Sequence, residues 1–140
     1  FVTVHHSFKI LKEMNDTCAH TIAKFDDKVI GYALSMTKSF GDKIEVLKPM
    51  FDEISKLEKC NNYLVMGQIC IDKEYRGKGL FRGLYNFMKT KVCATLFDEI
   101  ITEIDVKNNR SINAHKAIGF ETLKEYMANN QKWRIVSLKV

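Results

Sequence analysis

A short run of glycines and basic residues in the middle of the chain has the composition of a phosphate-binding loop. The run is Arg76-Gly77-Lys78-Gly79, with an apolar stretch before it and leucines and aromatic residues at helical spacing after it. Glycine lacks a Cβ, so backbone N–H groups can turn toward one point, and the helix that follows adds a positive dipole end. Arg82 adds further charge. The segment is predicted to bind a pyrophosphate, and the alternative is a tight structural loop with incidental basic residues.

The glycine spacing excludes two common nucleotide-binding motifs. A P-loop needs G-x-x-x-x-G-K-[ST], and the sequence contains no such string. A dinucleotide fingerprint needs G-x-G-x-x-G directly after a strand. Here Arg82 occupies the third glycine position, and the apolar run ends about five residues before Gly77.

A second segment, about 30 residues downstream, supports a different class of ligand. Residues 108–120, NNRSINAHKAIGF, carry an asparagine and a small residue on a predicted short helix that closes with Gly-Phe. Residues 76–80 also follow the R/Q-x-x-G-x-G/A pattern up to its last position, and together the two segments resemble the GNAT superfamily of acyl-CoA-dependent N-acetyltransferases. The order of predicted elements also matches that family, so the resemblance covers almost the whole chain.

The resemblance implies an enzyme that transfers the acetyl group of acetyl-CoA to a primary amine by direct attack in a ternary complex. The acceptor would be a small molecule or a peptide, no metal would be needed, and a homodimer stays open. The cofactor-binding residues that the resemblance implies are Ile69, Cys70, Ile71, Arg76, Gly77, Lys78, Gly79, Leu80, Phe81, Arg82, Asn108, Ser111 and His115.

Attack of an amine on a thioester needs an oxyanion site and a proton donor for the departing thiolate. In the family, the strand before the glycine loop splays from its neighbour, which implies that a backbone N–H of Cys70 or Ile71 lies near the carbonyl. His115 stands where the family usually has the tyrosine that protonates the thiolate. An imidazolium can do the same near neutral pH. The alternative is that His115 is only a polar residue on a helix face.

The general base has more than one candidate. The position of a common family glutamate falls on Val65, so Glu103 on the following strand is a weak candidate, and a water chain ending at Tyr63 or Gln68 is another. A nucleophilic cysteine needs a base beside it, and the sequence puts no histidine next to Cys70. Cys70 is therefore expected to be buried by packing.

Two further departures from the family pattern matter. The family usually has Gly or Ala where this chain has Phe81, so the phenyl ring is expected to point away from the pyrophosphate. The family's fold also begins with a strand and a helix that precede the first segment of this sequence, and these are expected to be missing here.

The elements that must position these motifs alternate along the chain. The order α-β-β-α-β-α-β-α-β-β predicts an α/β (α+β) fold, with a mixed, mostly antiparallel central sheet flanked by helices in one domain, residues 1–140. One parallel step is expected between 63–71 and 100–106. Residues 39–62 are expected to pack on the sheet, or alternatively to cover the acceptor as a partly apolar lid. Helices are predicted over 4–15, from Pro49, over 79–96 and over 108–119, and strands over 18–25, 29–36, 63–71, 100–106, 120–127 and 133–140.

Composition bounds the remaining classes of function. The formal charge is +5, from 22 basic and 17 acidic residues, but the two signs are interspersed, so no continuous basic face for nucleic acid is expected. No apolar run long enough for a membrane span occurs, and residues 1–10 do not resemble a signal peptide.

The four cysteines form no C-x-x-C pair and the histidines complete no zinc pattern, which favours reduced thiols and a cytoplasmic protein. A non-catalytic acyl-CoA-binding module of the same fold stays open as the second function. It would be favoured if His115 were buried away from the thioester.

Overall fold

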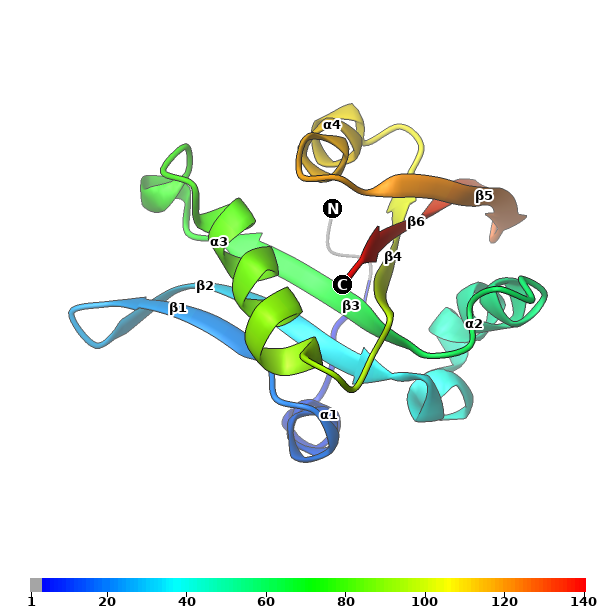
Figure 1. Cartoon of the computed structure of the whole chain (residues 1–140), viewed down its shortest axis with the longest axis horizontal. Coiled ribbons are helices and arrows are strands. Elements are labelled where there is room, and N and C mark those ends of the chain that lie inside the picture. Colours follow the sequence, from blue (N-terminus) through cyan, green and yellow to red (C-terminus); the bar gives the residue numbers. More distant parts are fainter. Residues whose placement is uncertain (1–3) are drawn as a thin grey trace.

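The structure, a computed structural model, describes residues 4–140 and is built around one six-stranded sheet with the order β1-β2-β3-β4-β6-β5 (Figure 1). The strands are β1 (Thr21–Phe25), β2 (Lys28–Thr37), β3 (Tyr63–Ile71), β4 (Glu99–Asp105), β5 (Glu121–Ala128) and β6 (Gln131–Lys139). The α-helices of the described chain are α1 (Phe8–Thr17), α2 (Lys48–Ser55), α3 (Leu80–Phe87) and α4 (Asn109–Ala117). The predicted element order and the mixed, mostly antiparallel sheet are confirmed.

The parallel step lies where the sequence predicts it. Strands β3 and β4 pair in parallel from Tyr63 opposite Glu99 to Val65 opposite Ile101, and all other pairs of strands are antiparallel. Parallel neighbours need a crossover connection, and α3 supplies it. This step brings the glycine loop, which follows β3, to the same edge of the sheet as the end of β4.

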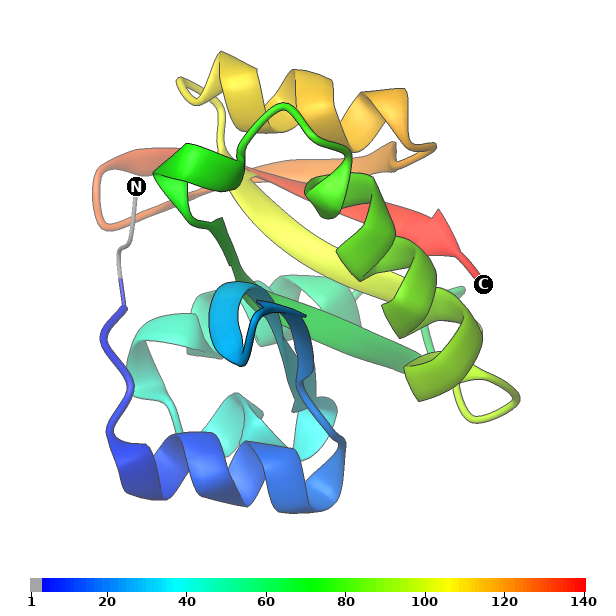
Figure 2. The ribbon, with the colours of Figure 1, turned by 90° about the vertical axis from the view of Figure 1, so that its left-hand side faces the viewer.

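Beyond Val65 the two parallel strands separate. Their register pairing stops at Ile101, and the last link is a hydrogen bond of 2.9 Å from the Thr102 hydroxyl to the Met66 carbonyl oxygen. On its other side β3 contains a bulge, because Leu34 of β2 stands opposite both Gly67 and Gln68. A bulge bends its strand, and β3 and β4 diverge as a wedge (Figure 2).

Two buried clusters cover the two faces of the sheet. Alternate residues of a strand point to opposite faces, so β4 sends Ile100 and Ile104 to one cluster and Ile101 to the other. Helix α3 and the segment after α4 pack on the first face, and α1 and α2 pack on the second. Glu103 and Asp105 continue the Ile101 face beyond the point where β3 and β4 separate.

The helix predicted over residues 79–96 is shorter and less regular than expected. It is α-helical to Phe87, continues as a π-helix over Met88–Cys93 (η4), and ends at Ala94, where φ is +42°. The Thr90 hydroxyl donates to the Asn86 carbonyl oxygen at 2.8 Å, and such back-bonding loosens and bends a helix.

The first helix and the first strand both begin a few residues later in the chain than the sequence predicts. Helix α1 starts later than expected because Ser7 caps it, accepting the Ile10 N–H at 3.2 Å, and β1 begins at Thr21 instead of residue 18. In the segment before β3, the short helices η1 (Lys38–Asp42) and η2 (Glu45–Leu47) lead into α2. Met50, Phe51 and Ile54 of α2 are core residues, as the packing interpretation of this segment predicts. No helix of residues 4–140 combines the length and apolarity that a bilayer crossing requires.

Candidate active site

A cavity of about 680 Å³ occupies the wedge between β3 and β4. The beginning of α3, the first turns of α4 and the region around α2 complete its walls. It brings together most residues that the sequence singles out, although they come from segments up to 46 positions apart. The predicted residues that line it are Ile69, Cys70, Ile71, Arg76, Gly77, Gly79, Leu80, Phe81, Glu103, Asn108, Ser111 and His115.

The glycine loop has the backbone conformation that a phosphate cradle requires. Gly77 has a φ of +75° and Gly79 a φ of +81°, a region that residues with a Cβ rarely adopt. A Cβ added at either glycine would meet no atom within 4 Å, so the space in front of the loop is open. The helical hydrogen bonds begin with Gly83 N–H to the Gly79 carbonyl, at 2.9 Å, which leaves the N–H groups of residues 80–82 for another acceptor. These features fit a bound diphosphate.

The basic side chains near the loop differ in direction. Arg76 lines the cavity and donates to the Ile71 carbonyl oxygen at 3.1 Å. Lys78 lies over the Tyr75 ring at 5.6 Å, and Arg82 donates to the Ala117 carbonyl oxygen at 3.4 Å. Neither Lys78 nor Arg82 is among the residues that line the cavity.

His115 lies between α4 and α3, and its side chain is only 2% exposed. Its Nδ1 is 2.7 Å from the Ser111 carbonyl oxygen, which can only accept, so Nδ1 carries the proton. Its Nε2 is 2.7 Å from the Tyr85 hydroxyl, which therefore donates to it. Burial lowers the pKa of His115 below its usual value. His115 and Ser111 share one helix face, as predicted.

Aromatic rings enclose this histidine. Phe81 packs edge-on against it with ring centroids 5.0 Å apart, and Tyr85 and Phe120 contact it at 5.4 and 5.0 Å. The Phe81 ring therefore lies against α4. This neutral, enclosed imidazole with both nitrogens occupied is unfavourable for the acid role that the resemblance implies, and it links α3 to α4.

Glu103 is a carboxyl group that lines the cavity. It is partly buried where β4 separates from β3, and the Tyr126 hydroxyl of β5 donates a hydrogen bond to its carboxylate. Burial raises the pKa of Glu103 to about 7, although the Tyr126 hydrogen bond acts in the opposite direction. A base with a pKa near the operating pH is the most effective one.

The comparison with known proteins agrees with this geometry. Residues 2–120 match the family model described as "Acetyltransferase (GNAT) family". The chain belongs to the GNAT acetyltransferase family. No protein with a curated functional description matches it.

Solved structures with the same fold include the following three, each less than 25% identical to this chain. The ribosomal-protein-S18-alanine N-acetyltransferase from Escherichia coli aligns over 98% of this chain and 79% of its own, with a TM-score of 0.67 and 13% identity. The NatC complex bound to Gag peptide and CoA aligns over 99% of this chain and 83% of its own, with a TM-score of 0.71 and 16% identity. A GNAT family acetyltransferase from Elizabethkingia anophelis with acetyl-CoA bound aligns over 96% of this chain and 84% of its own, with a TM-score of 0.64 and 8% identity. The family supports acetyl transfer from acetyl-CoA as the general activity.

One prediction for this GNAT chain is wrong. Cys70 is exposed and lines the cavity instead of being buried. The reason is the wedge: with β4 turned away, the side chains of β3 beyond residue 66 lose the cover expected of a central strand. Among the described residues no histidine makes a hydrogen bond to Cys70, as the sequence predicts.

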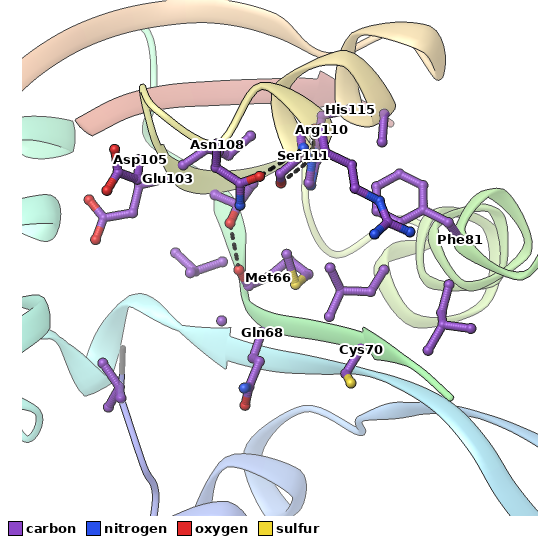
Figure 3. Close-up of a pocket in the computed structure, with 18 of the residues that line it drawn as sticks. Met66, Gln68, Cys70, Phe81, Glu103, Asp105, Asn108, Arg110, Ser111 and His115 are labelled. Atoms are coloured by element: carbon purple, nitrogen blue, oxygen red, sulfur yellow. Dashed lines mark hydrogen bonds between the residues drawn. The ribbon is translucent and has the colours of Figure 1, made fainter. Parts of the chain in front are cut away.

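Other lining residues of the GNAT cavity were not recognised from the sequence. Arg110 precedes Ser111 in the recognised motif, and its side chain extends from α4 toward Phe81 (Figure 3). Asp105 lies on the same face of β4 as Glu103, and the alternation of side chains along a strand was a signal that could have predicted this. Trp133 and His6 had no local signal, because only the sheet register and the path of the first residues bring them to the cavity.

Proposed function

We propose that this chain is an N-acetyltransferase that transfers the acetyl group of acetyl-CoA to a primary amine by direct attack in a ternary complex. One observation carries the proposal. The same cavity has, at one end, a glycine loop whose backbone conformation suits a phosphate and, at the other, a carboxyl group whose pKa is raised to about 7. A donor held at the first end and an amine deprotonated at the second would meet along β3.

The residues that would hold acetyl-CoA follow from this arrangement. The N–H groups of residues 77–82 suit the diphosphate, and Arg76 and Arg110 supply positive charge from the cavity wall. Ile69, Cys70 and Ile71 would follow the pantetheine arm along the unpaired edge of β3. The acetyl thioester is the electrophile, and the protein supplies its position and the surrounding dipoles.

The reaction needs three proton movements. Glu103 accepts a proton from the acceptor's ammonium group, directly or through one water molecule, and the free amine forms a C–N bond to the acetyl carbon. A backbone N–H of Cys70 or Ile71 stabilises the oxyanion, the attacking nitrogen, now positively charged, releases its second proton to water, and the C–S bond then breaks. The thiolate takes up one proton. Because both nitrogens of His115 are engaged within the protein, we assign that proton to water.

A non-catalytic acyl-CoA-binding module of the same fold is the second candidate function. The burial of His115 favours it, since the histidine in the usual donor position is not free to act as an acid. The raised pKa of Glu103, which lines the cavity, favours the enzyme, because a binding module has no use for a base there.

The experiment that separates the two measures free thiol released from acetyl-CoA in the presence of a panel of primary amines. We expect release that depends on the amine and yields the N-acetylated product by mass spectrometry. Tight binding of acetyl-CoA with no release above the hydrolysis rate for any amine would contradict the enzyme and support the binding module.

A further inference from the structure

We propose that the acceptor is an aliphatic primary amine that carries a second positive charge a short chain away, and that Asp105 binds this second charge. The inference rests on the proposed function and extends it to the class of acceptor. It makes Asp105 a specificity-determining residue.

The cavity is electrically polarised. Among the described residues, the arginines that line it are Arg76 of the glycine loop and Arg110, whose side chain extends toward Phe81, and the carboxylates that line it are Glu103 and Asp105. Figure 3 shows the two carboxylates together at the opposite end from Phe81. The acidic end can therefore attract a cation while the basic end is occupied by the phosphates of the donor.

Asp105 is held in place without being neutralised. It accepts the Lys107 N–H at 2.9 Å and the Gln131 side-chain amide at 3.2 Å. Both donors are uncharged, and no ion pair involves Asp105 among the residues that the structure describes. A fixed carboxylate with neutral partners keeps its charge available to a ligand.

Trp133 provides an independent reason to expect a cation here. It stands directly opposite Asp105 in the antiparallel β4–β6 pairing, so the two side chains share one face of the sheet, and both line the cavity. An indole is the strongest side-chain partner for cation–π contacts. A tryptophan beside an unpaired carboxylate is an arrangement that suits an ammonium group.

The spacing of the two carboxylates sets the kind of amine. Glu103 and Asp105 are two positions apart on one strand face, so their Cα atoms lie roughly 7 Å apart. An amine at Glu103 and a second cation at Asp105 are therefore separated by a chain of about four carbons. Leu47 and Met50 line the cavity as apolar wall residues that suit such a chain.

The test compares acceptors of equal length and different charge. Amine-dependent thiol release is measured with 1,4-diaminobutane, butylamine and 4-aminobutyrate, and with a peptide in which two lysines are adjacent. We expect kcat/KM for the diamine to exceed that for butylamine by about tenfold, as one partly buried ion pair allows, with 4-aminobutyrate lowest. The ratio of diamine to peptide identifies whether the dication is a free molecule or a lysine-rich segment.

Asp105→Asn keeps the shape of the side chain and removes its charge. We expect it to lower the preference for the diamine over butylamine at least fivefold. The matched control is Asp42→Asn, an exposed aspartate of η1 outside the cavity, which should leave this preference unchanged. Circular dichroism and acetyl-CoA affinity establish that each variant is folded.

The outcomes separate this inference from the function on which it rests. Equal rates for diamine and butylamine, or transfer only to other amines, would overturn the dicationic acceptor and leave the enzyme intact. If acetyl-CoA binds and no amine is acetylated, the proposed enzymatic function is wrong, and calorimetry then tests the role of Asp105. Binding of 1,4-diaminobutane to the acetyl-CoA-loaded protein, weakened by Asp105→Asn, would support the inference that the cavity takes a dication at Asp105. Absence of that binding would overturn the inference.

Discussion

The two ends of the cavity are built on different principles. The glycine-loop end comes from one continuous segment, residues 76–82, and offers backbone N–H groups held by two glycines with positive φ. The carboxylate end is assembled from β4, β5 and β6: Glu103, Asp105 and Trp133 line it, and Tyr126 donates a hydrogen bond to Glu103. The first depends on chain conformation, and the second depends on sheet register and burial.

This difference predicts how each end responds to substitution. A change at the loop acts by altering φ or by blocking the approach of the phosphates, so its effect falls on affinity for acetyl-CoA. A change at the carboxylate end acts through charge and proton affinity, so its effect falls on turnover and on the pH profile. The following substitutions test that separation.

Glu103→Gln should have the largest effect. The amide cannot accept the proton of the acceptor's ammonium group, so kcat should fall roughly 10²-fold or more, within the usual range for a positioned base. In the unsubstituted protein kcat should rise with pH across about 7, where Glu103 ionises, and the variant should lack this step. Acetyl-CoA affinity, measured by calorimetry, should remain within a factor of two. Full turnover in the variant would move the base to another group, such as water at Gln68.

Gly79→Asp should lower acetyl-CoA affinity at least tenfold, or about 1.4 kcal/mol, because it adds a Cβ at positive φ and a negative charge beside the phosphates. The matched pair Gly79→Ala and Gly83→Ala separates strain from helix effects. Gly83 lies inside α3 without a positive φ, and alanine there meets no atom within 4 Å. We expect Gly83→Ala to bind normally and Gly79→Ala to bind more weakly. Unchanged affinity in a folded Gly79→Asp protein would show that the loop is not the phosphate site.

His115→Ala should change kcat less than about tenfold, because the structure gives the histidine a positioning role between α3 and α4. It should lower the free energy of unfolding by about 1–3 kcal/mol, since the buried Tyr85 hydroxyl loses its partner. The acid role predicts instead a loss of roughly 10²-fold in kcat with recovery in His115→Tyr. Thermal unfolding and single-turnover rates on the same variants decide between them, and Tyr85→Phe is the control that removes the same hydrogen bond from the other side.

The sequence predicts the loop end well because its determinants are local. The glycines at positions 77 and 79 indicate a backbone with positive φ, and the apolar run 63–71 followed by a helical pattern predicts the parallel crossover. It predicts the carboxylate end poorly because burial there depends on distant partners. The raised pKa of Glu103 depends on how β5 and β6 cover β4, and the enclosure of His115 depends on Tyr85, 30 residues earlier. The exposure of Cys70 depends on the bulge and on the separation of β3 from β4, which no pattern within β3 contains.

Tyr126→Phe should have the smallest effect, and it tests whether burial and hydrogen bonding oppose each other at Glu103. The Tyr126 hydroxyl donates to the carboxylate and stabilises the charged form, so it lowers a pKa that burial raises to about 7. Without the hydroxyl the pKa of Glu103 should rise further, and the rising limb of kcat against pH should move to higher pH. At pH 7 kcat should fall only about two- to fivefold, and above pH 9 it should approach the original value.

The stability of the protein should also depend on the pKa of Glu103. The folded protein keeps a proton on Glu103 that the unfolded chain has released, so the free energy of unfolding decreases as pH rises from about 4.5 through about 7. In Tyr126→Phe this decrease should extend to higher pH. Tyr63→Phe is the matched control, because Tyr63 is a buried sheet tyrosine that makes no hydrogen bond to Glu103. Superimposable pH profiles for Tyr126→Phe and the unsubstituted protein would mean that the Tyr126 hydroxyl does not set the proton affinity of the base.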